Sequence, residues 1–166
     1  MHRALSFYLK AEKKKYSLAL ASRLFLDEGK AYLALQDLDA SEYALKKSLQ
    51  FKPVSVDAYF QYAQLLKKKT RFDEAYVHVD RYLRYAWQKD SHDAVVLKAR
   101  LAFELGQHRE VVQLLENNVK ETDDVSVSFV LAAAHYSVEN YKRSAELFEK
   151  VYQRCPDNLD VAYNCA

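Results

Sequence analysis

The side chains that could bind a metal or act as a nucleophile are few and scattered along the sequence. They are His2, His78, His92, His108, His135, Cys155 and Cys165. No two of the histidines stand three or four residues apart, the spacing that places two metal ligands on one face of a helix. We interpret each histidine as a surface or packing residue, and the cysteines lack the spacing of a metal site. The sequence therefore predicts no catalytic residue, no metal and no cofactor, and a protein that is not an enzyme.

The sequence also contains little that indicates binding of a phosphate-containing ligand. The only glycines are Gly29 and Gly106, so a glycine-rich phosphate loop is excluded. Lysines cluster at residues 13–15 and 67–69, but the net charge is only +2 and no recognition motif accompanies the clusters. We interpret these lysines as a solvated face and expect no nucleic-acid partner.

The charge is distributed unevenly along the chain. Residues 1–89 contain 17 Lys and Arg against 10 Asp and Glu, a net charge of +7. Residues 90–166 contain 8 against 13, a net charge of −5. We hypothesise that the basic end meets an acidic protein partner or the acidic end of another copy of the chain.

Composition indicates a folded, helical chain. Two glycines and two prolines among 166 residues leave little material for β-turns, and hydrophobic residues make up 50% of the sequence against 29% charged residues. No stretch approaches the roughly twenty apolar residues that span a bilayer. Two cysteines are too few for a disulfide framework, so we expect a cytoplasmic protein.

A helical pattern repeats along most of the chain, and residues 125–158 are its clearest copy. Leu131, Ala132 and His135 fall three and four apart on a first helix, with a small residue where a neighbouring helix would press close. Ser144 and Phe148 repeat the spacing on a second helix. Similar patterns recur at intervals of about thirty-four residues. The four copies span residues 22–55, 56–89, 92–124 and 125–158.

This arrangement resembles the tetratricopeptide repeat, whose consensus is a series of large, small and aromatic positions closed by a proline. The resemblance implies a single all-α array, a right-handed superhelix of stacked antiparallel helix pairs. The predicted pairs are Ser17–Gln36 with Asp39–Phe51, Ser55–Lys69 with Phe72–Trp87, Ser91–Leu105 with Arg109–Glu121, and Val125–Val138 with Tyr141–Arg154. Ser55 and Ser91 are predicted N-caps, and Gly106 is predicted to adopt the left-handed conformation that ends a helix.

In arrays of this kind the first helix of each pair lines a concave groove, which implies a binding site for a partner peptide or helix. Carried over by register, the candidate groove residues are Lys30, Phe60, Gln64, Lys67, Lys68, Arg100, Phe103, Phe129, Tyr136 and Tyr163. Aromatic anchors with a few cations are typical of protein interfaces. Two alternatives stay open: the phenylalanines pack between neighbouring helices, and the cations form a solvated face.

The two ends of the chain carry partial patterns. Residues 2–15 resemble a second helix without its first, a half repeat or capping helix, and residues 159–166 resemble the start of a further first helix. Either the chain is a segment of a longer array, or it is complete and caps itself in an unusual way. The main alternative to a segment is that a partner or a second copy covers the C-terminal end. Self-association through that end is therefore one expectation.

The resulting functional prediction is a non-catalytic scaffold or adaptor that binds a protein. The carboxylate clamp that some related arrays use to hold heat-shock chaperones is missing, because Gln61, Asp93 and Leu97 stand where Asn, Lys and Arg are needed. The alternative function is a regulatory or accessory domain of an enzyme, or a secretion-type chaperone.

Overall fold

The computed structural model describes residues 2–86, 92–118 and 124–155, and the side chains from Lys14 onwards. In these ranges the chain is all-α. The helices are α1 (His2–Ala34), α2 (Leu38–Gln50), α3 (Val56–Lys68), α4 (Phe72–Tyr85), α5 (His92–Glu104), α6 (His108–Asn118), α7 (Val125–Ser137) and α8 (Tyr141–Arg154). Apart from the start of α1 and the end of α6, these bounds agree with the predicted helices to within about two residues.

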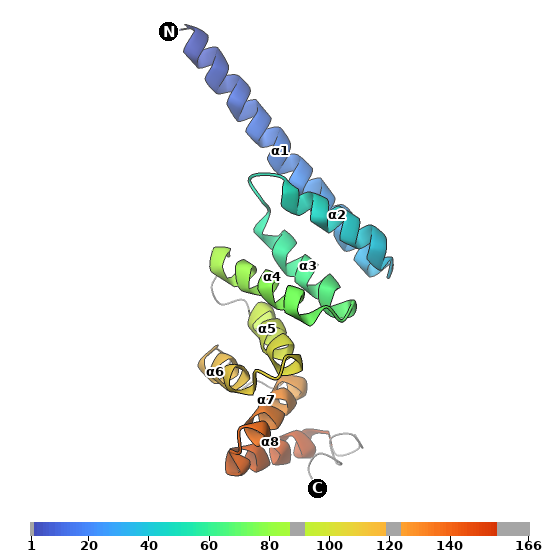
Figure 1. Cartoon of the computed structure of the whole chain (residues 1–166), viewed down its shortest axis with the longest axis vertical. Helices are drawn as coiled ribbons and strands as arrows, with labels where there is room; N and C mark the ends of the chain where they lie inside the picture. Colours follow the sequence, from blue (N-terminus) through green and yellow to red (C-terminus); the bar gives the residue numbers. More distant parts are fainter. Residues whose placement is uncertain (1, 87–91, 119–123, 156–166) are drawn as a thin grey trace. The chain divides into compact units, whose positions relative to one another are not determined.

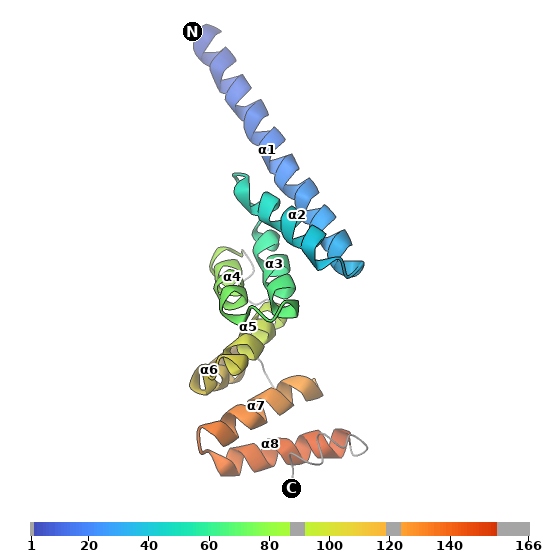
Figure 2. The same cartoon turned by 45° about the vertical axis from the view of Figure 1, so that its right-hand side comes forward.

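The chain forms two compact units, Met1–Trp87 and Gln88–Ala166, and each is described by itself. In unit 1, α1 pairs with α2 and α3 pairs with α4, while α3 also packs against α2 and α1. In unit 2, α5 pairs with α6 and α7 with α8, while α7 also packs against α6 and α5. Figures 1 and 2 show the hairpins. The predicted fold class of stacked antiparallel helix pairs is confirmed.

Helix α1 is longer than predicted. It runs unbroken through 33 residues, about 50 Å at 1.5 Å per residue, and its N-terminal part extends beyond α2 in both views (Figures 1 and 2). The separate helix predicted over residues 2–15 is therefore the first part of α1. The physical reason is that no glycine or proline occurs before Gly29, and Lys, Ala and Glu, all good helix formers, fill residues 10–15.

Small residues let the paired helices approach closely, as predicted. Ser41 of α2 donates a hydrogen bond to the backbone oxygen of Gly29 in α1 at 2.8 Å. Ser144 of α8 donates to the backbone oxygen of Ala132 in α7 at 2.9 Å. Both serines are buried. In each case the two residues lie twelve apart in sequence, so the pattern positions one close contact in each hairpin.

Every first helix ends on a residue in the left-handed conformation. These residues are Gln36 (φ 62°), Thr70 (φ 57°), Gly106 (φ 73°) and Glu139 (φ 65°). The backbone NH of the next residue then bonds a carbonyl in the last helical turn, as from Gln107 to Ala102 at 2.8 Å. The prediction for Gly106 is confirmed, while the other three positions carry no glycine and escaped prediction.

The predicted N-cap position of α3 is confirmed, and two aspartates that were not predicted cap other helices. Ser55 occupies the N-cap of α3 but its side chain makes no capping bond, and Ser91 lies outside the described residues. Asp37 instead accepts a bond from the backbone NH of Ala40 at 3.0 Å. Asp124 accepts from the backbone NH of Ser126 at 2.9 Å, and hydrogen bonds from the Ser126 side chain and backbone lower the pKa of Asp124.

Candidate functional site

Three of the predicted groove residues are phenylalanines, and each contacts a ring of the second helix in its own pair. Phe60 lies 5.2 Å from Tyr82 between ring centroids. Phe129 lies 5.6 Å from Phe148, and Phe103 lies 5.1 Å from His108. All three phenylalanines are half-buried. They therefore contribute to packing within the hairpins and leave part of each ring accessible to a partner.

The predicted polar groove residues lie on the first helices with partial exposure, and several have local partners. Lys30 lies 3.9 Å from Asp27, and Lys68 donates to Gln36 at 3.2 Å. Arg100 donates to the hydroxyl of Ser126 at 2.6 Å. Gln64 and Lys67 are half-buried, and Tyr163 lies outside the described residues. That these residues bind a partner stays a prediction.

Unit 2 brings two of the predicted residues, Phe103 and Tyr136, to the turn ends of its hairpins. Tyr136 of α7 and Tyr141 of α8 form an edge-to-face pair with centroids 5.5 Å apart. Phe103 and His108 form the equivalent pair one repeat earlier, and the rings are inclined at 67° in both. Tyr136 and Tyr141 are 63% and 58% exposed. Edge-to-face packing fixes the rings without burying them, so they are available to a ligand.

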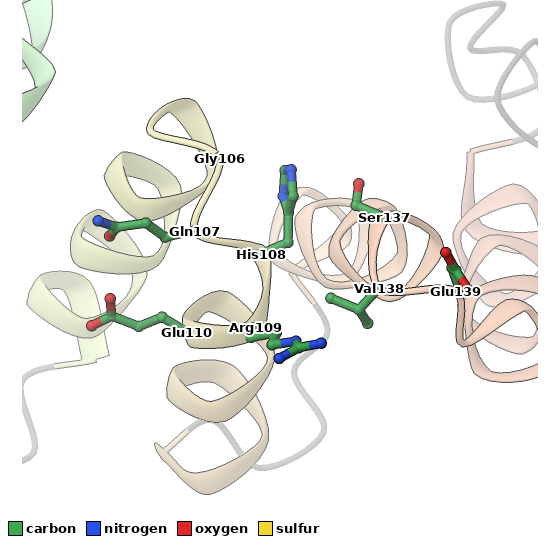
Figure 3. Close-up of a pocket in the computed structure, with 8 residues that line it drawn as sticks. All are labelled: Gly106, Gln107, His108, Arg109, Glu110, Ser137, Val138 and Glu139. Carbon is green, nitrogen blue, oxygen red and sulfur yellow. The ribbon is translucent and has the colours of Figure 1, made fainter.

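A recess of about 690 Å³ is lined by residues 106–110 and 137–139, and His108 is the one of these four rings that lines it. Figure 3 shows Arg109 extending from the start of α6 toward Val138, while Glu110 points to the other side. Glu110 lies 3.5 Å from Lys98, which offsets its charge. Arg109 is exposed and forms no hydrogen bond or ion pair within the described part of the chain. We call Phe103, His108, Arg109, Tyr136 and Tyr141 the turn-end surface.

Ion pairs bridge the corresponding position in unit 1. There Asp39, three residues after the left-handed turn residue, takes the place of Arg109, and Lys69 takes the place of Val138. Lys69 lies 2.7 Å from Asp39 and 2.5 Å from Glu42, and Arg71 lies 2.7 Å from Glu42. In unit 2 neither charge is present at the equivalent positions, and the Arg109 guanidinium has no partner among the described residues.

The ion cluster around Glu42 stabilises unit 1. The carboxylate is only 13% exposed and also receives Lys46 at 2.7 Å. Burial alone would raise the pKa of Glu42, but hydrogen bonds from Lys46, Lys69 and Arg71 outweigh it and hold the pKa well below its usual range. Sequence reasoning missed this cluster because its members come from α2, the end of α3 and the start of α4.

The remaining titratable feature is His78 of α4. Its ring stacks on Tyr59 at 5.9 Å and meets the edge of Tyr62 at 4.7 Å. Burial, with a smaller contribution from Arg81, lowers the pKa of His78 to about 4. A neutral histidine between two rings is a packing residue, and no group of three metal-ligating side chains occurs among the described residues. None of the described helices is long and apolar enough to cross a membrane.

No protein-family model matches the sequence, and no curated protein matches it at a significant level. Solved structures do match the fold. YrrB, a TPR protein with an unusual peptide-binding site, is 16% identical, with a TM-score of 0.75 over 85% of this chain and 72% of YrrB. MamA from Desulfovibrio magneticus is 15% identical, with a TM-score of 0.77 over 87% and 81% of the two chains. PilF of Pseudomonas aeruginosa is 18% identical, with a TM-score of 0.67 over 90% and 68%. At these identities the likeness concerns the fold, and the fold of this chain is a TPR-like helical repeat.

Proposed function

We propose that the chain is a non-catalytic scaffold that binds a protein partner, and that unit 2 holds a segment of this partner at the turn-end surface. The observation that carries the proposal is the pair of edge-to-face ring contacts at the turn ends of unit 2, together with Arg109, which lines the same recess as His108 and has no partner among the described residues. Tyrosine and arginine supply much of the binding energy in protein interfaces. A cytoplasmic setting is part of the proposal, because the two cysteines favour a reducing compartment.

The chemistry of the surface defines the segment. Exposed rings of Tyr136 and Tyr141 offer apolar area with hydroxyl groups at the edge, which suits an apolar or aromatic side chain. Arg109 offers a planar fork of donors, which suits a carboxylate. The ligand we propose is therefore a peptide segment that combines an apolar side chain with an Asp, a Glu or a terminal carboxylate. The peptide-binding site of YrrB, a protein of similar fold, supports a peptide as the ligand.

Capture from a native lysate with quantitative mass spectrometry tests this proposal. The test variant is Arg109→Ser with Tyr136→Ser, two exposed changes that leave the core intact. The matched control is Tyr43→Ser with Lys47→Ser, which removes another exposed tyrosine and a cation 5.5 Å from its ring. The proposal expects a partner held by the wild type and the control but lost by the test variant. A partner that survives the test variant, or one that both variants lose equally, would contradict it.

A further inference from the structure

Helix α1 carries an apolar stripe that nothing in unit 1 covers. Tyr16, Leu20 and Leu24 are 73%, 61% and 62% exposed. They stand four residues apart, so their side chains lie along one face of the helix. We call these three residues the α1 stripe. Three neighbouring large apolar side chains in water form a patch that marks an interaction site.

The equivalent positions in the other repeats indicate which face of α1 carries the stripe. Leu24 corresponds to Ala58 of α3 and Val127 of α7, which are 0% and 3% exposed. Helix α3 packs on the preceding pair, α1 and α2, and α7 packs on α5 and α6, whereas α1 has no preceding pair among the described residues. Ala31, two turns further along α1, is also exposed, while its counterpart Leu65 is fully buried. The stripe therefore lies on a helix-packing face from which the helix is missing.

The charges around the stripe indicate which helix fits. Lys14 and Lys15 precede it and Glu28 follows it, all exposed. Within the described residues none of the three has an ion-pair partner, whereas Asp27 lies 3.4 Å from Arg23. Two copies of α1 placed antiparallel bring the basic end of each beside the acidic end of the other. A parallel placement would bring like charges together instead.

We propose that two copies of this chain associate through the α1 stripe in an antiparallel, two-fold symmetric pair. A two-fold contact uses the same patch on both copies, so the stripe must complement itself. With the axis passing beside residue 21, Lys14 of each copy faces Glu28 of the other, because these two residues stand fourteen apart and project from nearly the same side of the helix. Leu20 and Leu24 then pack across the axis. Within unit 1, the N-terminal part of α1 extends beyond α2 (Figures 1 and 2), so α2 does not cover it.

Sedimentation equilibrium at low ionic strength tests the pair, since salt weakens exposed charge pairs. The wild type should show a monomer–dimer equilibrium. Leu20→Ser with Leu24→Ser should remove the dimer. The matched control is Leu35→Ser, which changes another exposed leucine, one residue after the end of α1, and this variant should still dimerise. Circular dichroism checks that all variants stay helical. A wild type that is monomeric at about millimolar concentration, or a dimer that survives the stripe variant, would overturn the proposal.

Charge reversal then tests the antiparallel register. Lys14→Glu or Glu28→Lys alone should raise the dimer dissociation constant by about tenfold or more. A mixture of the two variants should form a heterodimer, because each contact again joins opposite charges, and the double variant should dimerise with itself. If neither combination restores association, the antiparallel pairing is wrong. This assay detects no peptide ligand, so its outcome is independent of the proposed binding at the turn-end surface.

Discussion

Gly29 is the position where the packing of unit 1 makes the sharpest prediction. A Cβ atom added to it would lie 2.6 Å from Cγ and 2.7 Å from Cδ2 of Leu45, and 3.3 Å from the backbone nitrogen of that residue. Leu45 is fully buried, so its side chain has no open space to move into. The substitution Gly29→Ala must therefore push α1 and α2 apart.

Two opposing free-energy contributions determine how much Gly29→Ala changes the stability of the fold. Alanine is better than glycine inside a helix by about 1 kcal/mol. Overpacking a well-packed core costs about 1–3 kcal/mol, and two contacts below 3 Å with a buried side chain place this site near the upper end. The separation of the helices also strains the bond from Ser41 to the Gly29 carbonyl. We expect Gly29→Ala to lower the free energy of unfolding by about 2 kcal/mol.

Urea unfolding followed by circular dichroism measures this change. Ala31→Gly, at an exposed position of the same helix, is the control for helix preference and should cost about 1 kcal/mol. Leu45→Ala removes the atoms that clash, so adding it to Gly29→Ala should cost less than the sum of the two single changes. A Gly29→Ala variant that is as stable as the wild type or more stable would refute the packing argument, because helix preference alone would then decide.

Unit 1 offers three further tests. Glu42→Gln should lower the free energy of unfolding by about 1–2 kcal/mol at pH 7. Because folding lowers the pKa of Glu42, this difference between the two proteins should be present above about pH 4.3 and should shrink as the pH falls below it. Urea unfolding of both proteins over a range of pH measures the difference. His78 has a pKa of about 4 in the folded chain against 6.5 when exposed. As the pH falls, the unfolded chain therefore binds the proton first, and the free energy of unfolding should fall by about 1–2 kcal/mol from pH 6.5 to 4. An equal fall in the His78→Gln variant would contradict this assignment. Thr70→Gly should stabilise by about 0.5–1 kcal/mol, since a β-branched residue at φ 57° is strained and glycine is not; a rise in the thermal midpoint is the readout, and a loss would contradict the strain.

The helix pairs could be predicted because their signals are local. Periodic apolar and small positions, such as Ala132 and Ser144, mark both helices of a hairpin within about thirty-four residues. Gly106 was identified as a left-handed residue because glycine favours that conformation. The same conformation at Gln36 and Thr70 was missed, since there the array imposes it against the preference of the residue.

Only part of the candidate site could be predicted from the sequence. Phe103 and Tyr136 could be named from register, but their ring partners His108 and Tyr141 come from the second helices and needed the geometry of the turn. Arg109 stands at the position that Asp39 occupies in unit 1, where Asp39 pairs with Lys69. Arg109 has no such partner among the described residues. Comparing turn positions across repeats would have revealed that exchange of charge. The long α1 was missed because a repeat register was extended through residues 2–15, where continuous helix formers dominate.

Hydrogen–deuterium exchange is the measurement that tests the binding role most directly. Peptides selected from a random display library against the wild type, with counter-selection against Arg109→Ser with Tyr136→Ser, would serve as probes. We predict that a selected peptide slows amide exchange at residues 103–109 and 136–141 and contains an acidic residue near an apolar one. Protection confined to other segments, or a library that yields no peptide distinguishing the two proteins, would contradict a binding site at the turn-end surface.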